Sequence, residues 1–353
     1  MVVFMALGAF DRILGNRFGL GEKFEEGIMA MGSLALAMIG IICLAPVLAN
    51  LLRPVVVPLY QALGADPAMF AGTLLANDMG GAPLAQELAL TQEAGQFGGL
   101  IVGSMLGPTI VFTIPVGLGI IKAEDRPTLA TGVLAGVITI PIGSFAGGLA
   151  AGFPVGMVLR NLIPIALFAV LIALGLAFLP NGMVKGFQVF GRIIVIIITI
   201  GLAAAIIQKL TPLTLIPGMN PISEGVAIVG DIAVVLAGAF PLVYVITRVF
   251  KTPLMKLGHV LGMNDIAAAG LVATLANNIP MFQMLHDMDR RGKIINVAFA
   301  VSAAFVFGDH LGFTAGFDST MIFPMIVGKL VGGVTAVAVA MLITRKYKEE
   351  RHG

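Results

Sequence analysis

Two polar breaks end apolar stretches of the sequence about two hundred positions apart. Asn77-Asp78 is followed by a methionine and two glycines, and Asn277-Asn278 is followed by an isoleucine and a proline. Asparagine offers hydrogen-bond donors and acceptors, and aspartate offers a negative charge. In a hydrophobic chain, backbone unwinds at membrane depth only where protein or a water-filled cavity covers it. Matching breaks in two halves of a chain are typical of the binding site of a membrane transporter.

Further polar residues lie inside apolar stretches. Asp309-His310 falls within one such stretch, and Ser104 and Thr109 lie in another. Ionisable residues at membrane depth are energetically costly and are usually functional, and prolines such as Pro108 free backbone carbonyls that a cation can use. We therefore predict a substrate-binding site for a small positively charged solute. Its candidate residues are Asn77, Asp78, Ser104, Thr109, Asn277, Asn278, Ser302, Asp309 and His310.

Each of these patterns also has a structural interpretation. Asn-Asp before Gly-Gly is a common turn. His310 could hydrogen-bond a neighbouring helix and fix its packing, and glycines such as Gly143 favour close helix contacts. Phenylalanines such as Phe112 and Phe305 could line a cation site or simply fill the core.

Composition defines the fold class. Of 353 residues, 58% are hydrophobic and only 11% are charged, whereas soluble domains carry about 25% charged residues. Apolar runs of about 20 residues, long enough to cross a bilayer, recur along the chain. The net charge of +2 and the single cysteine predict no nucleic-acid partner, disulfide framework, metal site or cofactor. The chain is predicted to be an all-α polytopic membrane protein.

The sequence contains an internal repeat. Several landmarks recur with an offset of 198 positions, namely Glu26-Gly27 with Glu224-Gly225, Leu63-Gly64 with Leu261-Gly262, and Ser104 with Ser302. A constant offset over distant landmarks indicates a duplication. We predict nine transmembrane helices, at 1–14, 27–52, 97–121, 127–151, 158–180, 186–209, 225–250, 295–319 and 321–344.

These helices group into a first repeat (1–157), a linking helix (158–185), a second repeat (186–344) and a basic tail (345–353). Two short apolar segments, 54–64 and 252–262, are predicted to form separate interfacial helices that lead into the breaks.

The distribution of basic residues predicts the topology. Lysine and arginine favour cytoplasmic loops, and they gather in alternate loops only if segments 66–96 and 264–293 enter the membrane and return on the same side. A full crossing by the first of these segments would move Lys122 and Arg126 outside. We therefore expect a re-entrant broken hairpin in each repeat, two inverted repeats, and a cytoplasmic C-terminus.

The residues around these breaks resemble a known family, the ethanolamine permeases of bacterial ethanolamine-utilisation operons (the EutH family). The resemblance covers nearly all of residues 10–344. The segments that carry it are 24–32, 69–76, 78–81, 103–112, 272–282, 299–305, 308–313 and 321–329.

The resemblance implies a non-enzymatic permease of the bacterial inner membrane that imports ethanolamine for breakdown. Its partners would be ethanolamine and the lipid bilayer, and a homo-oligomer is left open. One alternative is a carrier of the same fold for another small amine or polar solute. Another is an intramembrane enzyme that uses Asp309-His310 with Ser302 or Ser104 as nucleophile.

Overall fold

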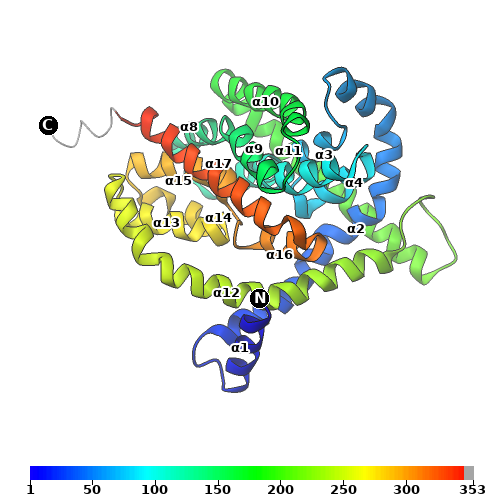
Figure 1. Cartoon of the computed structure of the whole chain (residues 1–353), viewed down its shortest axis with the longest axis horizontal. Coiled ribbons are helices and arrows are strands. Elements are labelled where there is room, and N and C mark those ends of the chain that lie inside the picture. The colour runs from blue at the N-terminus through cyan, green and yellow to red at the C-terminus, as the bar shows by residue number, and fades with distance from the viewer. Residues whose placement is uncertain (346–353) are drawn as a thin grey trace.

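A computed structural model describes residues 1–345, apart from some side chains within 180–184 and 250–259; most of the predicted basic tail lies outside the described residues. The described part is built of helices without β-strands, which confirms the predicted all-α class. Figure 1 shows α12 along one edge of the bundle and α10 at the opposite edge, with α1 projecting beyond α12.

The first part of the chain contains α1 (Val2–Ile13), α2 (Leu20–Ala62), α3 (Ala68–Leu74), α4 (Gly81–Leu88), α5 (Gln92–Gln96), α6 (Leu106–Pro108), α7 (Ile114–Ile120), α8 (Arg126–Val137), α9 (Ile140–Ala150) and α10 (Val155–Phe178). The second part contains α11 (Pro180–Leu210), α12 (Ile222–Val260), α13 (Asp265–Ala276), α14 (Asn278–Met284), α15 (Arg290–Ala303), α16 (Asp309–Phe317) and α17 (Ile322–Ile343).

Short 3₁₀ and π segments complete the chain. The 3₁₀ segments are η1 (Asn77–Met79), η3 (Val102–Ser104), η5 (Ala123–Asp125), η6 (Leu285–Asp287) and η7 (Ser319–Met321), and the π segments are η2 (Phe97–Ile101) and η4 (Thr109–Thr113).

Within the described residues, seven helical segments are long and apolar enough to cross a membrane. They are Leu20–Ala62, Gln92–Ile120, Ala123–Ala150, Val155–Phe178, Lys185–Leu210, Ile222–Val249 and Ser319–Ile343. The predicted count of nine is therefore not confirmed. Segment 1–14 forms a helix of 12 residues, about 18 Å long at 1.5 Å per residue and short for a bilayer core of about 30 Å. Segment 295–319 is divided between α15 and α16.

The prediction of separate interfacial helices at 54–64 and 252–262 is wrong. Residues 54–62 continue α2, and residues 252–260 continue α12. Prolines occur inside both helices, including Pro54 and Pro253, but helices in a membrane protein tolerate them when neighbouring helices cover the freed backbone groups. The end of α2 is covered by α3, since the Tyr60 ring meets the Phe70 ring edge to face at 6.3 Å, and the end of α12 packs on α13.

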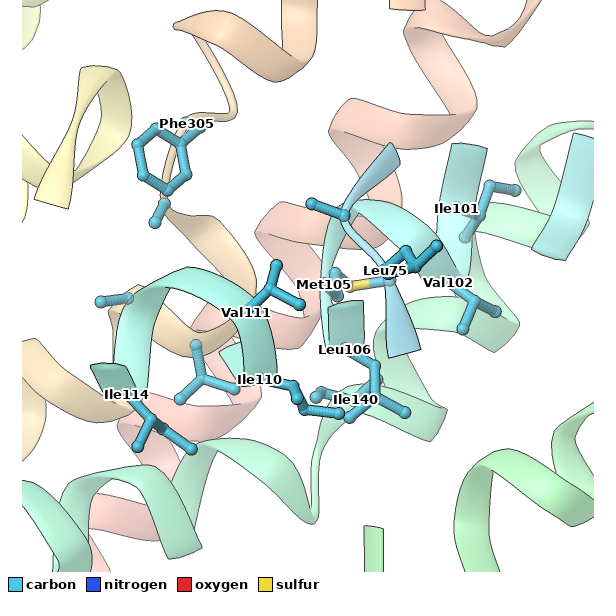
Figure 2. Packing of buried hydrophobic residues seen from close by; sticks show 14 of the residues in the cluster. Leu75, Ile101, Val102, Met105, Leu106, Ile110, Val111, Ile114, Ile140 and Phe305 are labelled. Carbon is cyan, nitrogen blue, oxygen red and sulfur yellow. The ribbon is translucent and has the colours of Figure 1, made fainter. Parts of the chain in front are cut away.

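The core joins elements that are far apart in the sequence. Helix α15 packs on α8 and α17, and α17 packs on α9. Close approach of α9 and α17 depends on glycine, because a Cβ atom on Gly143 would lie 2.6 Å from the Gly328 carbonyl oxygen. This confirms the expected close helix contact at Gly143. Figure 2 shows buried apolar side chains of residues 101–114 gathered with Leu75, which directly follows α3.

Candidate functional site

A cavity of about 280 Å³ lies where α2, the break after α3, the Pro108 region and the start of α16 meet. Ser33 on its wall is exposed, whereas His310 is buried, so the cavity leads from the surface toward His310. The lining residues are Ala30, Ser33, Leu34, Ala37, Ala76, Asp78, Met79, Pro108, Phe112, Phe305, Asp309 and His310. Two carboxylates and a histidine thus face one mostly apolar space.

A tight turn places Asp78 on the cavity wall. Leu75 and Ala76 are extended, and the Ala76 carbonyl accepts hydrogen bonds from Met79 N at 3.0 Å and Gly81 N at 2.8 Å. Gly80 has a φ of +97°, a conformation that glycine adopts readily. The turn interpretation and the site interpretation of this sequence are therefore compatible, because the turn carries the carboxylate.

An unwound segment, Ala304–Gly308, places Asp309 and His310. Its backbone is held by the last turn of α13, since Phe305 N donates to Thr274 O at 3.2 Å and Phe307 N donates to Leu275 O at 2.9 Å. These bonds satisfy backbone groups that a lipid environment could not. Asp309 then opens α16. The sequence places this pair in the middle of a span, whereas in the structure the pair begins a new helix.

Gly308 permits the close contact between this segment and the second break. A Cβ atom there would lie 2.0 Å from the Ala276 carbonyl oxygen. Gly107 has a corresponding role in the first half, where a Cβ atom would lie 1.9 Å from the Leu75 carbonyl oxygen. At both breaks a glycine therefore lies directly against a backbone carbonyl at the end of the preceding helix. Gly107 lies against the Leu75 carbonyl, just after α3, and Gly308 lies against the Ala276 carbonyl, at the end of α13.

A row of ionisable groups extends inward from the cavity. His310 Nε2 lies 3.9 Å from Asp78 Oδ1, and His310 Nδ1 lies 3.0 Å from Lys329 Nζ. The ammonium form of Lys329 has only donors, and with that form a neutral His310 accepts at Nδ1 and carries its proton on Nε2, toward Asp78. The proton position on His310 is therefore linked to the protonation of Lys329.

Lys329 is a residue that the sequence analysis missed. It is fully buried on α17 and also donates to the Ser104 carbonyl. Pro108 follows four residues after Ser104 and has no N–H, so this carbonyl lacks its usual helical donor. The Ser104 carbonyl that Pro108 leaves free is thus hydrogen-bonded by the protein's own Lys329. The signal was present, because a lysine within the apolar span 321–344 is an ionisable residue at membrane depth.

Aromatic rings form part of the cavity wall. Phe112 and Phe305 meet edge to face with ring centroids 5.4 Å apart, and Phe305 lies 5.1 Å from the His310 ring. Aromatic faces attract cations, and they do so more strongly where water is excluded. Carboxylates beside aromatic rings suit an organic ammonium ion. Among residues 1–345, no cluster of three or more His, Cys, Asp or Glu side chains that could hold a metal ion occurs.

Asn277 faces a different space from Asp78. It lines a second cavity of about 300 Å³, which Asp309 also lines. Its side-chain oxygen accepts a hydrogen bond from Ile279 N at 2.8 Å and caps α14. Asn278 is buried, and its Nδ2 donates to Thr113 Oγ1 at 3.1 Å.

The other predicted residues are buried in helix contacts. Thr109 Oγ1 contacts Met105 O at 2.8 Å and Val301 O at 3.2 Å, which links the two halves. Ser104 Oγ donates to Ile101 O at 2.8 Å. Ser302 packs against Gly332, where a Cβ atom would lie 2.8 Å from Ser302 Oγ. Buried Asn77 has no hydrogen-bond partner for its side chain within the described residues.

The fold and the cavity define a polytopic α-helical membrane protein with a buried row of ionisable groups. The sequence model of the family described as "Ethanolamine utilisation protein, EutH" matches residues 1–343. The chain belongs to the EutH family.

Its relatives include proteins named as permeases. It is 71% identical over 346 residues to the probable ethanolamine permease EutH of Listeria monocytogenes, covering 98% of this chain and 93% of that protein. It is 54% identical over 384 residues to the protein of the same name from Escherichia coli, covering 98% and 94%. An uncharacterized Bacillus subtilis protein, YxeR, is 52% identical over 98% of this chain and 93% of its own length. No solved structure matches.

Proposed function

We propose that this protein carries ethanolamine, as its ammonium ion, across the bacterial inner membrane. The observation that carries the proposal is the placement of Asp78 and Asp309 on one cavity with aromatic walls. The names of the relatives from Listeria monocytogenes and Escherichia coli support the choice of solute.

The chemistry of the cavity fits this solute. A primary amine with an ordinary pKa near that of lysine is protonated at neutral pH, and a carboxylate replaces part of the hydration that the ammonium loses. The faces of Phe112 and Phe305 add cation–π attraction. The hydroxyl group of the solute finds polar partners in Ser33 and in the Nε2 side of His310.

We further propose that 1–157 and 186–344 are inverted repeats joined by the helix of 158–185, with re-entrant segments at 66–96 and 264–293. Reciprocal contacts support this arrangement. Asp78 of the first break lies 3.9 Å from His310 of the second half. Asn278 of the second break donates a hydrogen bond to Thr113 of the first half. Alternating access would then move one half against the other around the cavity.

In this proposal the chain crosses the membrane nine times, because residues 290–317 and helix α1 cross in addition to the seven long helical segments. Residues 290–317, broken at 304–308, correspond in the repeat to the continuous segment Gln92–Ile120. Helix α1 takes the place before α2 that α11 takes before α12. The bias of basic residues toward alternate loops supports a cytoplasmic C-terminus.

The enzyme alternative has no support from the geometry. Ser104 Oγ donates to a helix carbonyl and Ser302 Oγ lies against Gly332. His310 directs its two nitrogens toward Lys329 and Asp78. No described contact joins this histidine to a serine hydroxyl that it could activate.

Uptake of labelled ethanolamine by purified protein in proteoliposomes tests the proposal. We expect saturable uptake above that of empty liposomes, and its loss in Asp309→Asn. The matched control is Asp287→Asn, which changes an exposed carboxylate in η6 and should leave uptake unchanged. Uptake by the wild type no faster than empty liposomes would refute the function, and normal uptake by Asp309→Asn would refute the site.

A further inference from the structure

A second cavity of about 300 Å³ adjoins the first. It is bounded by the start of α2, by α12, by the second break and by the segment that precedes α16. Its lining residues with polar side chains are Lys23, Glu26, Tyr244, Thr247, Asn277 and Asp309. Asp309 lines both cavities, so this carboxylate lies between them.

One face of α2 connects the two cavities. Lys23 and Glu26 line the second cavity, and Ala30, Ser33 and Ala37 line the first. These positions are three or four residues apart and therefore lie in a row on one helix face. Glu26 precedes Ser33 by about 10 Å along the helix, at 1.5 Å per residue. The cavities therefore follow one another along α2, with a carboxylate in each and Asp309 shared.

Glu26 already binds a primary ammonium group. Lys23 Nζ donates to both carboxylate oxygens of Glu26, at 2.6 Å and 2.7 Å. The side chains of Lys23 and Glu26 are 31% and 44% exposed, and ion pairs with such access to water are weak and exchange readily. An alkyl ammonium from solution carries the same charged group and can take the position of Lys23. The ring of Tyr244 adds an aromatic wall.

We propose that the second cavity is a second binding site for the ammonium group of the solute, formed by Glu26 and Asp309, with Lys23 as an internal competitor. The site lies near the start of α2, on the side of the molecule that carries the N-terminal loop, residues 14–19 between α1 and α2. It receives the solute between the first cavity and that side. This inference rests on the proposed transport of ethanolamine.

The test compares Glu26→Gln with Glu25→Gln in right-side-out and inside-out membrane vesicles. Glu25 is adjacent and equally charged, but it pairs with Arg12 at 3.2 Å. We expect Glu26→Gln to raise the half-saturation constant for ethanolamine about fivefold, the factor expected of an exposed ion pair, and only when ethanolamine is added on the face of the N-terminal loop. Glu25→Gln should leave both faces unchanged.

Lys23→Met provides a change in the opposite direction. Removal of the competing ammonium should lower the half-saturation constant on the same face, an effect that general damage to the protein would not produce. Equal effects of Glu26→Gln and Glu25→Gln, or equal shifts on both faces, would overturn the second site. If Glu26→Gln does not fold, Glu26→Asp and Lys23→Met are compared with Glu25→Gln instead, again by whether the half-saturation constant shifts on one face only. Wild-type vesicles without ethanolamine transport would instead refute the proposed function itself.

Discussion

The two breaks of the chain have similar backbones but different chemistry. Each follows a short helix and meets a glycine from a neighbouring segment at close range. The first presents a carboxylate, Asp78, to a cavity that contains His310. The second presents amides, of which Asn277 caps a helix and Asn278 is hydrogen-bonded to Thr113. One break is therefore suited to bind a cation, whereas the other is suited to hold the two halves together.

Among changes at the two breaks, the largest effect should come from Asp78→Asn. This variant keeps the shape of the turn and removes the charge, so we expect ethanolamine uptake in proteoliposomes to fall roughly 100-fold, as for a desolvated charge-assisted contact. The double variant with Asn278→Asp restores the total charge at the wrong break and should not recover uptake. Recovery in the double variant would contradict the division of roles between the breaks.

Lys329→Met should have the next largest effect. His310 Nδ1 and the Ser104 carbonyl would both lose a donor while remaining buried, and uptake should fall roughly 10- to 100-fold. Because His310 would lose the ionisable group 3.0 Å from its Nδ1, the pH profile of the residual uptake should also change. Lys329→Arg keeps a donor and should retain more activity. An unchanged pH profile in Lys329→Met would show that Lys329 does not set the state of His310.

Asn278→Ala should affect stability more than transport. The Thr113 hydroxyl would lose its buried partner, at a cost of about 1–2 kcal/mol, which a thermal-shift assay in detergent would detect. The half-saturation constant for ethanolamine should change less than about twofold. Thr113→Val should produce a similar loss of stability. A large increase in the half-saturation constant would place Asn278 in the binding site.

The smallest effect should come from Asn277→Ala. Loss of the hydrogen bond that caps α14 should lower stability by about 1 kcal/mol. Asn277→Asp retains an oxygen that can cap the helix and should preserve stability in the same thermal-shift assay. Equal losses in both variants would show that the cap does not explain the role of this residue.

Much of this comparison could be predicted from the sequence. Low charge and recurring apolar runs predicted the all-α membrane fold, and the repeated polar pairs located the breaks that follow α3 and α13. Asp78, Asp309 and His310 were selected because ionisable groups are costly at membrane depth, and the structure places all three on one cavity. Proline content misled the prediction at Pro54 and Pro253, which lie inside the continuous helices α2 and α12.

Other features depend on tertiary contacts that have no local signal. The proximity of Lys329 to His310 arises from the position of α17 beside the Ser104 carbonyl. The division of one predicted span at Ala304–Gly308 depends on hydrogen bonds to α13, about 30 residues earlier. The second cavity requires α2, α12 and the second break to meet. The spacing of residues within the sequence does not predict these tertiary contacts.

Competition binding to the purified protein tests most directly whether the carboxylate at the first break, Asp78, recognises an ammonium ion. Labelled ethanolamine would be bound to the wild type and displaced by ethylamine, which has the ammonium group, or by ethylene glycol, which has only hydroxyl groups. We predict displacement by ethylamine, little displacement by ethylene glycol, and loss of ethanolamine binding in Asp78→Asn. Equal displacement by both compounds, or undiminished binding to Asp78→Asn, would contradict the account.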